Sequence, residues 1–218
     1  MIGAVIAMQS EADILLEQMN ISRTLTISGK TVHVGTAFSK EVAVCVCGVG
    51  KVNAALGTQL LVSKFDVKKI INFGVAGSLN TQTNLCEIYQ ISDAVQFDFD
   101  LAQLNGTSIG TLNEYTENYL KLNLINADFP KRKLGTADRF NDSKDDYVLL
   151  TETLNADIRD MEGGAIVQAA YAASLPVYSF KAISDVAGSG STTEQYLMNK
   201  DKALENLKAA LPAIFDKL

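Results

Sequence analysis

The chain has 218 residues, of which 47% are hydrophobic and 20% are charged, and its formal net charge at pH 7 is −6. This length and composition predict one globular domain, residues 1–218, with a sizeable core. No cluster of Lys and Arg is longer than KRK at 131–133, which argues against nucleic acid or an anionic membrane as partner and favours a small molecule.

The chain begins with MIGAVIAMQSEAD, which lacks the basic start of a signal peptide, and no apolar run reaches membrane-spanning length, so we expect a cytoplasmic protein. Apolar runs predict strands at 3–8, 31–38, 41–48, 68–74, 87–97, 132–138 and 176–185, several of them covered on both faces. Helical patterns intervene at 10–19, 50–65, 161–174 and 192–218. This alternation predicts an α/β fold, a three-layer α/β/α sandwich with a mixed central sheet.

The last predicted helix carries an apolar stripe at helical spacing. It consists of Leu197, Leu204, Leu207, Leu211 and Phe215. We interpret this stripe as a face that packs into the core.

The histidine and cysteine residues restrict the possible chemistry. His33 is the only histidine, so neither a Ser-His-Asp triad nor a His-rich zinc site is expected. Cys45, Cys47 and Cys86 form no C-x-x-C pair, and the first two are interpreted as small apolar strand residues in a reducing compartment. Any catalysis must therefore use carboxylates, amides, hydroxyls or lysine.

Several polar and glycine-containing stretches follow predicted strands. In α/β sheets the ligand lies beyond the carboxyl ends of the strands. The stretches are MQSEAD with Glu11, GVAGSL with Gly74 and Gly77, DRFND with Phe140, SDVAG with Asp185, and RDMEGGAIV, which places Asp160, Met161 and Glu162 at the start of a helix. These stretches are the candidate site.

Each candidate also has a structural interpretation. Glu11 and Glu162 lie in predicted first helical turns, where the helix dipole favours a carboxylate, and this explanation is as strong as a functional one for either residue alone. GVAGSL resembles a common turn and lacks the spacing of a dinucleotide or P-loop motif. Asp185 follows an apolar strand, where an unpaired carboxylate is costly, so it should be hydrogen-bonded or catalytic.

Five stretches occur together and in order: AMQSEADILL, GVGKVNAALG, INFGVAGSL, DMEGGAI and KAISDVAG. Together they resemble the nucleoside phosphorylase superfamily and, within it, the methylthioadenosine/S-adenosylhomocysteine nucleosidases. The resemblance runs from residue 2 to about residue 215. It implies a nucleoside-phosphorylase-like fold, a homodimer, no cofactor, and cleavage of the N-glycosidic bond of adenine nucleosides by water.

The chemistry of that bond assigns roles to three carboxylates. Cleavage leaves an oxocarbenium-like ribose and a purine that departs once its N7 is protonated. Asp185 would be the general acid at N7, and Glu11 the general base on the attacking water. Glu162 would accept hydrogen bonds from the ribose hydroxyls and favour the developing cation. Around them, the predicted substrate-binding residues are Met8, Val49, Val75, Ala76, Gly77, Phe140, Asn141, Asp160, Met161 and Ser184.

The resemblance has three departures. Asp160 stands where the nucleosidases usually have Glu, and Lys181 replaces a more usual Arg in the last strand, where it donates without a bidentate fork. The segment 95–114, which in the family forms part of the 5′-substituent pocket and contacts the partner subunit, lacks the usual His/Tyr/Pro-rich pattern. The identity of the 5′-substituent therefore stays open.

Three functions remain in competition. Phosphorolytic relatives carry arginines for a phosphate dianion, whereas this chain has Gln9, Ser10 and Glu11 in the first loop and Asn72 and Phe73 before the glycines, which favours hydrolysis. The alternatives are a purine nucleoside phosphorylase or a nucleosidase for another nucleoside, of the futalosine type, and a binding protein without turnover. A binding protein would have little use for Glu11.

Overall fold

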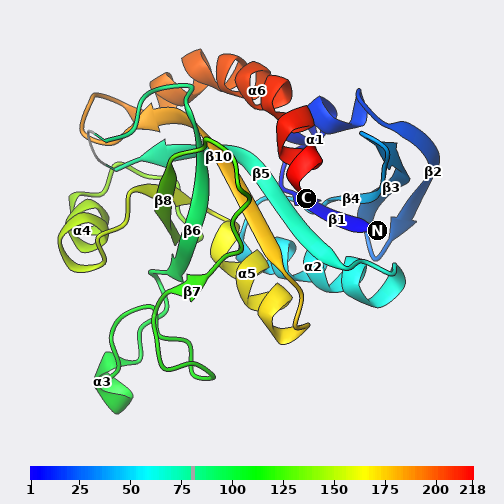
Figure 1. Ribbon diagram of the computed structural model, residues 1–218. Helices are drawn as coiled ribbons and strands as arrows, with labels where there is room; N and C mark the ends of the chain where they lie inside the picture. Colours follow the sequence, from blue (N-terminus) through cyan, green and yellow to red (C-terminus); the bar gives the residue numbers. More distant parts are fainter. Residues whose placement is uncertain (80–81) are drawn as a thin grey trace.

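The computed structural model describes residues 1–79 and 82–218, and its strands form one mixed sheet (Figure 1). The strands are β1 (Ile2–Ile6), β2 (Asn20–Ile27), β3 (Lys30–Ala37), β4 (Lys40–Val46), β5 (Lys69–Ser78), β6 (Ile88–Gln96), β7 (Leu120–Lys121), β8 (Lys131–Thr136), β9 (Ile158–Asp160) and β10 (Val177–Val186). Their spatial order is β10, β6, β8, β9, β5, β1, β4, β3, β2, and β7 pairs with β6.

The helices cover both faces of the sheet. They are α1 (Gln9–Leu16), α2 (Lys51–Lys64), α3 (Ala102–Asn105), α4 (Lys144–Val148), the π-helix η1 (Leu149–Thr153), α5 (Gly163–Ala172) and α6 (Thr192–Lys217). Helices α2 and α5 pack together over one core, and α1 and α6 lie over a second core on the other face (Figure 1). The predicted three-layer α/β/α sandwich with a mixed sheet is confirmed.

The central strands are apolar because both of their faces are covered. Every residue of β1 is buried, with Val5 in one core and Ile2, Ala4 and Ile6 in the other. In the part of the chain that the structure describes, no helix is both long enough and apolar enough to cross a bilayer.

Strand pairings bring distant segments to one end of the sheet. β10 pairs in parallel with β5 and antiparallel with β6. β6 pairs with β8, β8 with β9, and β9 returns to β5, so these five strands form a closed circuit. The circuit places the carboxyl ends of β5 and β10 side by side and the antiparallel strand β9 along the end of β5, where the site is found.

Several element boundaries differ from the sequence prediction. The GVAGSL stretch is strand and not a turn, because β5 continues to Ser78 through its pairing with β10. The helix predicted at 161–174 begins at Gly163, since Asp160 still belongs to β9 and Glu162 is the N-cap of α5. The edge strand β2, the short strand β9 and the pair α4 and η1 were not predicted.

The apolar stripe of α6 is only partly a core face. Leu204, Leu207, Leu211 and Phe215 are buried, but Leu197 is 62% exposed. Leu197 is therefore a correction to the predicted core, since the first turns of α6 line a cavity through Thr193, Tyr196 and Leu197. Cys45 and Cys47 are buried strand-end residues, as expected for small apolar side chains.

Candidate active site

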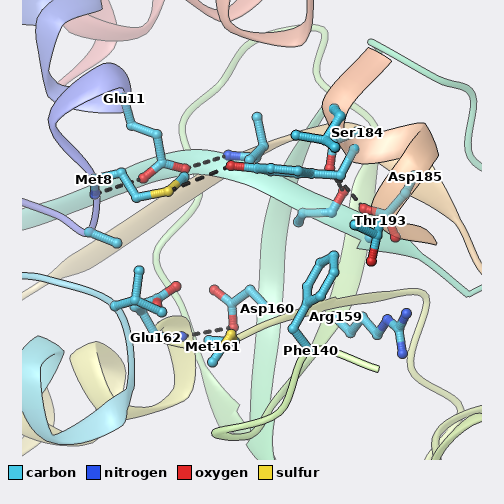
Figure 2. A pocket seen from close by; sticks show the side chains of 17 residues that line it. Met8, Glu11, Phe140, Arg159, Asp160, Met161, Glu162, Ser184, Asp185 and Thr193 are labelled. Carbon is cyan, nitrogen blue, oxygen red and sulfur yellow. Dashed lines mark hydrogen bonds between the residues drawn. The ribbon is translucent and has the colours of Figure 1, made fainter. Parts of the chain in front are cut away.

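A cavity of about 340 Å³ lies at the carboxyl ends of β1, β5 and β10 (Figure 2). Its walls come from several segments that are distant in sequence and meet at this edge of the sheet. The lining residues are Ala7, Met8, Glu11, Val49, Val75, Ala76, Gly77, Phe140, Arg159, Asp160, Met161, Glu162, Ser184, Asp185, Thr193, Tyr196 and Leu197. Every residue predicted to act on or bind substrate lies in this lining except Asn141.

Glu11 is fixed at one side of the cavity by two parts of the chain. Its Oε2 accepts a hydrogen bond from the backbone N–H of Met8 at 3.2 Å, and its Oε1 accepts one from the N–H of Val75 at 2.9 Å. The first bond is an ordinary helix-capping contact of α1, but the second ties the carboxylate to β5. Burial raises the pKa of Glu11, although the Lys181 charge and both backbone N–H groups oppose the rise. A rigid carboxylate of raised pKa is suited to accept a proton.

Asp185 lies across the cavity, near the end of β10 (Figure 2). The register between β10 and β5 shifts between Ile183 and Asp185, and such a bulge re-aims the side chains that follow it. The Ser184 hydroxyl donates to Asp185 Oδ2 at 2.8 Å, whereas Oδ1 is buried and has no partner among the described residues. Burial raises the pKa of Asp185, while the Ser184 hydrogen bond and the Arg159 charge oppose the rise. This carboxyl group is suited to hold a proton and to bind a ligand through Oδ1.

Glu162 is the third carboxyl group of the cavity. Its Oε1 accepts a hydrogen bond at 2.8 Å from the N–H of Gly50, the N-cap residue of α2, which orients the side chain from across the cavity. Glu162 is 8% exposed. Burial, and next the Asp160 charge, raise its pKa to about 7, against the opposing effect of Lys181. Its charge therefore changes near neutral pH.

Asp160 and Lys181 form a buried ion pair behind these groups. Lys181 Nζ lies 2.9 Å from Asp160 Oδ2, and the two side chains are 3% and 2% exposed. The same carboxylate accepts from Thr136 Oγ1 at 2.6 Å and from the N–H of Gly163 at 2.9 Å. Asp160 thus lines the cavity as predicted, but its oxygens are already engaged by protein donors, so it holds β8, α5 and Lys181 together.

Two glycines of β5 make room for the two opposed carboxyl groups. A Cβ atom on Gly74 would lie 2.3 Å from Glu11 Oε1, and one on Gly77 would lie 2.7 Å from Asp185 Oδ1. No side chain fits at either position while these carboxyl groups keep their places. The motif interpreted as a common turn is therefore a strand whose missing side chains admit Glu11 and Asp185.

Sequence reasoning missed five residues of the cavity wall. These are Ala7, Arg159, Thr193, Tyr196 and Leu197. The ring of Tyr196 packs edge-on against Phe140 with centroids 5.9 Å apart, and its hydroxyl group lies 3.7 Å from Met8 Sδ. Tyr196 and Leu197 could have been found from the sequence, because they lie in the first turns of a helix that directly follows the strand ending near Asp185.

Asn141, unlike the other predicted binding residues, does not line this cavity. Its side-chain Nδ2 donates to Asp146 Oδ2 at 3.1 Å, and its Oδ1 accepts from the N–H of Ser143 at 3.1 Å. Both bonds stabilise the start of α4 (Lys144–Val148), so this side chain is committed to the loop and not to the cavity. Within residues 1–79 and 82–218, no group of three or more His, Cys, Asp or Glu side chains is arranged to hold a metal ion.

Comparison with known proteins identifies the family. Residues 1–217 match the phosphorylase superfamily. The chain is 31% identical over 209 residues to a 5′-methylthioadenosine/S-adenosylhomocysteine nucleosidase of Listeria monocytogenes, covering 88% of each chain. The chain belongs to this nucleosidase family, within the phosphorylase superfamily.

Two further comparisons agree with this family. A 5′-methylthioadenosine/S-adenosylhomocysteine nucleosidase of Maridesulfovibrio salexigens is 29% identical over 222 residues, which is 94% of each chain. The crystal structure of the Helicobacter pylori nucleosidase is 22% identical and superposes with a TM-score of 0.90 over 100% of this chain and 98% of that one. The last comparison shows that the nucleosidase fold extends over the whole length of the chain.

Proposed function

We propose that this nucleosidase hydrolyses the N-glycosidic bond of 5′-methylthioadenosine, S-adenosylhomocysteine or both, and releases adenine and a thioribose sugar. The observation that carries the proposal is the arrangement of Glu11, Asp185 and Glu162 around one cavity, where burial raises the pKa of all three carboxyl groups. Glycoside hydrolysis needs an acid and a base at separate positions, and Asp185 and Glu11 supply two carboxyl groups on different sides of the cavity.

Asp185 acts as the general acid in this mechanism. Protonated Oδ1 donates to purine N7, and the proton moves to the base as the glycosidic bond breaks and the bonding electrons leave with the purine. Burial favours the protonated form of Asp185, and the Ser184 hydroxyl holds Oδ2 so that Oδ1 faces the ligand. The Phe140 ring, half exposed at the cavity wall, supplies a surface on which the base can stack.

Glu11 acts as the general base on the opposite side. Its carboxylate takes a proton from water, and the resulting hydroxide equivalent adds to the anomeric carbon of the oxocarbenium-like ribose. Hydrogen bonds from Val75 and Met8 fix both oxygens, so the base is held in place before the substrate binds. Lys181 lies close enough to interact electrostatically with Glu11 and favours its ionised form.

Glu162 binds the sugar in its ionised form. A carboxylate accepts hydrogen bonds from the two ribose hydroxyls and stabilises the positive charge that develops on the ring. The N–H of Gly50 occupies Oε1 and leaves Oε2 for the ribose. Met8 and Met161, which line the same cavity, supply apolar contacts to the sugar and its thioether substituent.

The charges around Lys181, on the side of the cavity that holds Glu11 and Glu162, favour water over phosphate as the nucleophile. Lys181 interacts with three carboxyl groups, those of Asp160, Glu162 and Glu11, and is already paired with the first. One ammonium ion among three carboxyl groups does not offer the free cation that a phosphate dianion requires.

The same proposal includes the assembly and setting expected from the sequence. We infer a homodimer, because Val52 and Leu56 of α2 are 70% and 56% exposed beside the half-exposed Val49 of the cavity wall, and an apolar surface of this kind is typical of an interface. Three free cysteines fit a reducing, cytoplasmic setting. We further infer that residues 1–218 act as a single nucleosidase domain, since one sheet runs through the chain.

Adenine release is the direct test of the proposed function. The purified protein would be incubated with 5′-methylthioadenosine, S-adenosylhomocysteine, adenosine and inosine, each with and without phosphate, and the bases separated by chromatography. We expect phosphate-independent release of adenine from the thio-nucleosides. Release that requires phosphate would make the protein a phosphorylase, and release from none of the four would overturn the assignment.

A further inference from the structure

A second cavity, of about 350 Å³, lies beside the active-site cavity. Arg159 lines both. The rest of the second wall consists of Asp142, Ser143, Lys144 and Tyr147 and of three small residues that follow Asp185 in the chain, Ala187, Gly188 and Gly190. Figure 2 shows Arg159 on the Asp185 side of the active-site cavity, across from Glu11 and Glu162.

The second cavity contains two cationic side chains with unused hydrogen-bond donors. Arg159 Nη2 is buried and has no hydrogen-bond partner among the described residues. Lys144 is exposed, and no ion pair involves its ammonium ion within residues 1–79 and 82–218. Asp142 is the opposing charge, and its Oδ2 accepts a 3.4 Å hydrogen bond from the N–H of Thr192. Two cations against one carboxylate favour an acidic ligand, since a buried guanidinium N–H without an acceptor is unfavourable.

The position of the second cavity relative to Asp185 indicates which part of a bound purine faces it. Arg159 and Asp142, which line that cavity, both interact electrostatically with Asp185. If Asp185 binds purine N7, a step that rests on the proposed function, the neighbouring exocyclic N6 lies at the same edge of the base. A substituent on N6 would therefore leave the active-site cavity toward Arg159.

We propose that the second cavity is a subsite for an acidic substituent on N6 of the adenine base, with Arg159 as the principal donor to its carboxylate and Lys144 as a second cation. The ligands of this class are adenine derivatives, free or as nucleosides, whose N6 carries a short chain that ends in a carboxylate. The contact is a charge-assisted hydrogen bond at the end of the chain, and no covalent step is involved.

Calorimetric binding of free bases tests the subsite without requiring turnover. The probes are adenine, N6-(3-carboxypropyl)adenine and the matched amide N6-(3-carbamoylpropyl)adenine, which has nearly the same size but no charge. We expect the carboxylate to bind about tenfold more tightly than the amide, as one charge-assisted hydrogen bond provides. Arg159→Gln should reduce this ratio to about one, Lys144→Gln should reduce it about twofold to threefold, and Asp142→Asn should increase it.

The ratio of carboxylate affinity to amide affinity, taken within each variant, separates an effect on the subsite from other effects of the substitution. A general change in affinity or in the Asp185 acid cancels in the ratio, and Lys68→Gln, an exposed lysine whose side chain is 65% accessible, should leave it unchanged. A wild-type ratio near one, or binding of adenine with neither derivative bound, would overturn the proposal. Hydrolysis of 5′-methylthioadenosine is measured separately, so failure of that reaction with an intact ratio would reject the proposed function and retain the subsite.

Discussion

Lys181 Nζ lies 2.9 Å from Asp160 Oδ2, and this ion pair is almost completely buried beside Glu11 and Glu162. Burial opposes the Lys181 charge most strongly, but the surrounding carboxyl groups, led by Asp160, raise its pKa. The pair therefore keeps a charged ammonium ion behind the sugar side of the cavity. It also joins the last strand of the sheet to the β9 strand end from which Glu162 follows.

Replacing Lys181 by Met should strongly destabilise the protein. Removal of one partner leaves Asp160 as an uncompensated buried charge, which typically costs about 3–5 kcal/mol in the free energy of unfolding. Urea denaturation followed by circular dichroism measures this loss. The double variant Lys181→Met with Asp160→Asn should recover part of it, because the unpaired charge is gone. If the single and double variants were equally stable, the pair would not be the cause.

Asp185→Asn should strongly reduce hydrolysis and leave the fold intact. Asparagine retains the size of the side chain and accepts the Ser184 hydrogen bond, but it has no acidic proton for N7. General acid catalysis typically contributes about 10²- to 10⁴-fold, and kcat for 5′-methylthioadenosine should fall by that amount. Asp66→Asn, at a side chain that is 84% exposed, is the matched control and should keep wild-type kcat. A near-normal rate in the Asp185 variant would remove Asp185 from the role of acid.

Glu11→Gln should also suppress turnover, by a different route. The glutamine oxygen can still accept from the N–H of Val75, so the side chain should stay in place, but a neutral amide cannot take a proton from water. We expect kcat to fall at least about 10²-fold while calorimetric affinity for 5′-methylthioadenosine changes little. Affinity lost in parallel with kcat would indicate that Glu11 binds substrate and does not activate water.

The three carboxyl groups could be proposed from the sequence for different reasons. Asp185 follows an apolar strand, where an unpaired carboxylate is costly, whereas Glu11 and Glu162 are singled out by their places near predicted helix starts and by the family resemblance. The layers could be predicted because continuous apolar strands such as β1 require cover on both faces. Arg159 could not be found in this way. It lies in a three-residue strand whose pairing with β5 and β8 depends on contacts distant in sequence.

Glycine roles also depended on the three-dimensional structure. GVAGSL has the composition of a turn, and local chemistry favours that interpretation. The long parallel pairing of β5 with β10 overrides the local preference, and only that pairing brings Asp185 Oδ1 against Gly77. Asn141 shows the opposite case, because this polar side chain of a candidate loop is hydrogen-bonded within the loop itself.

Gly74→Ala and Gly77→Ala should reduce activity through displacement of different carboxyl groups. The new Cβ atoms would lie 2.3 Å from Glu11 Oε1 and 2.7 Å from Asp185 Oδ1, so each carboxyl group must move. Misplacement of a reacting group by about 1 Å can reduce a rate about 10²-fold, and we expect losses of that order in kcat. Thermal unfolding of each variant checks that the sheet is retained. Wild-type kcat in both variants would show that neither glycine is needed for the positions of the carboxyl groups.

Glu162 should make the protein less stable as the pH rises from about 4.5 to about 7. Its pKa is raised from 4.5 to about 7 in the folded state, so in this range the folded protein binds more protons than the unfolded chain. Stability therefore falls with increasing pH across the range and has no further contribution from this group above it. Glu162→Gln should remove the penalty and stabilise the protein at pH 8 by about 1–3 kcal/mol.

Urea denaturation of wild type and Glu162→Gln at pH 5 and pH 8 measures this difference. The amide oxygen can still accept from the N–H of Gly50, so the loss of the charge is the main change. Glu11 and Asp185 also have raised pKa values and contribute with the same sign. Because the charges of Glu11 and Glu162 repel each other, the difference between wild type and variant includes the loss of that repulsion. Glu205→Gln, at a side chain that is 70% exposed, should show no such pH dependence. An identical pH dependence in wild type and Glu162→Gln would mean that Glu162 is ionised throughout this range, and the ribose-binding carboxylate would then need no deprotonation at neutral pH.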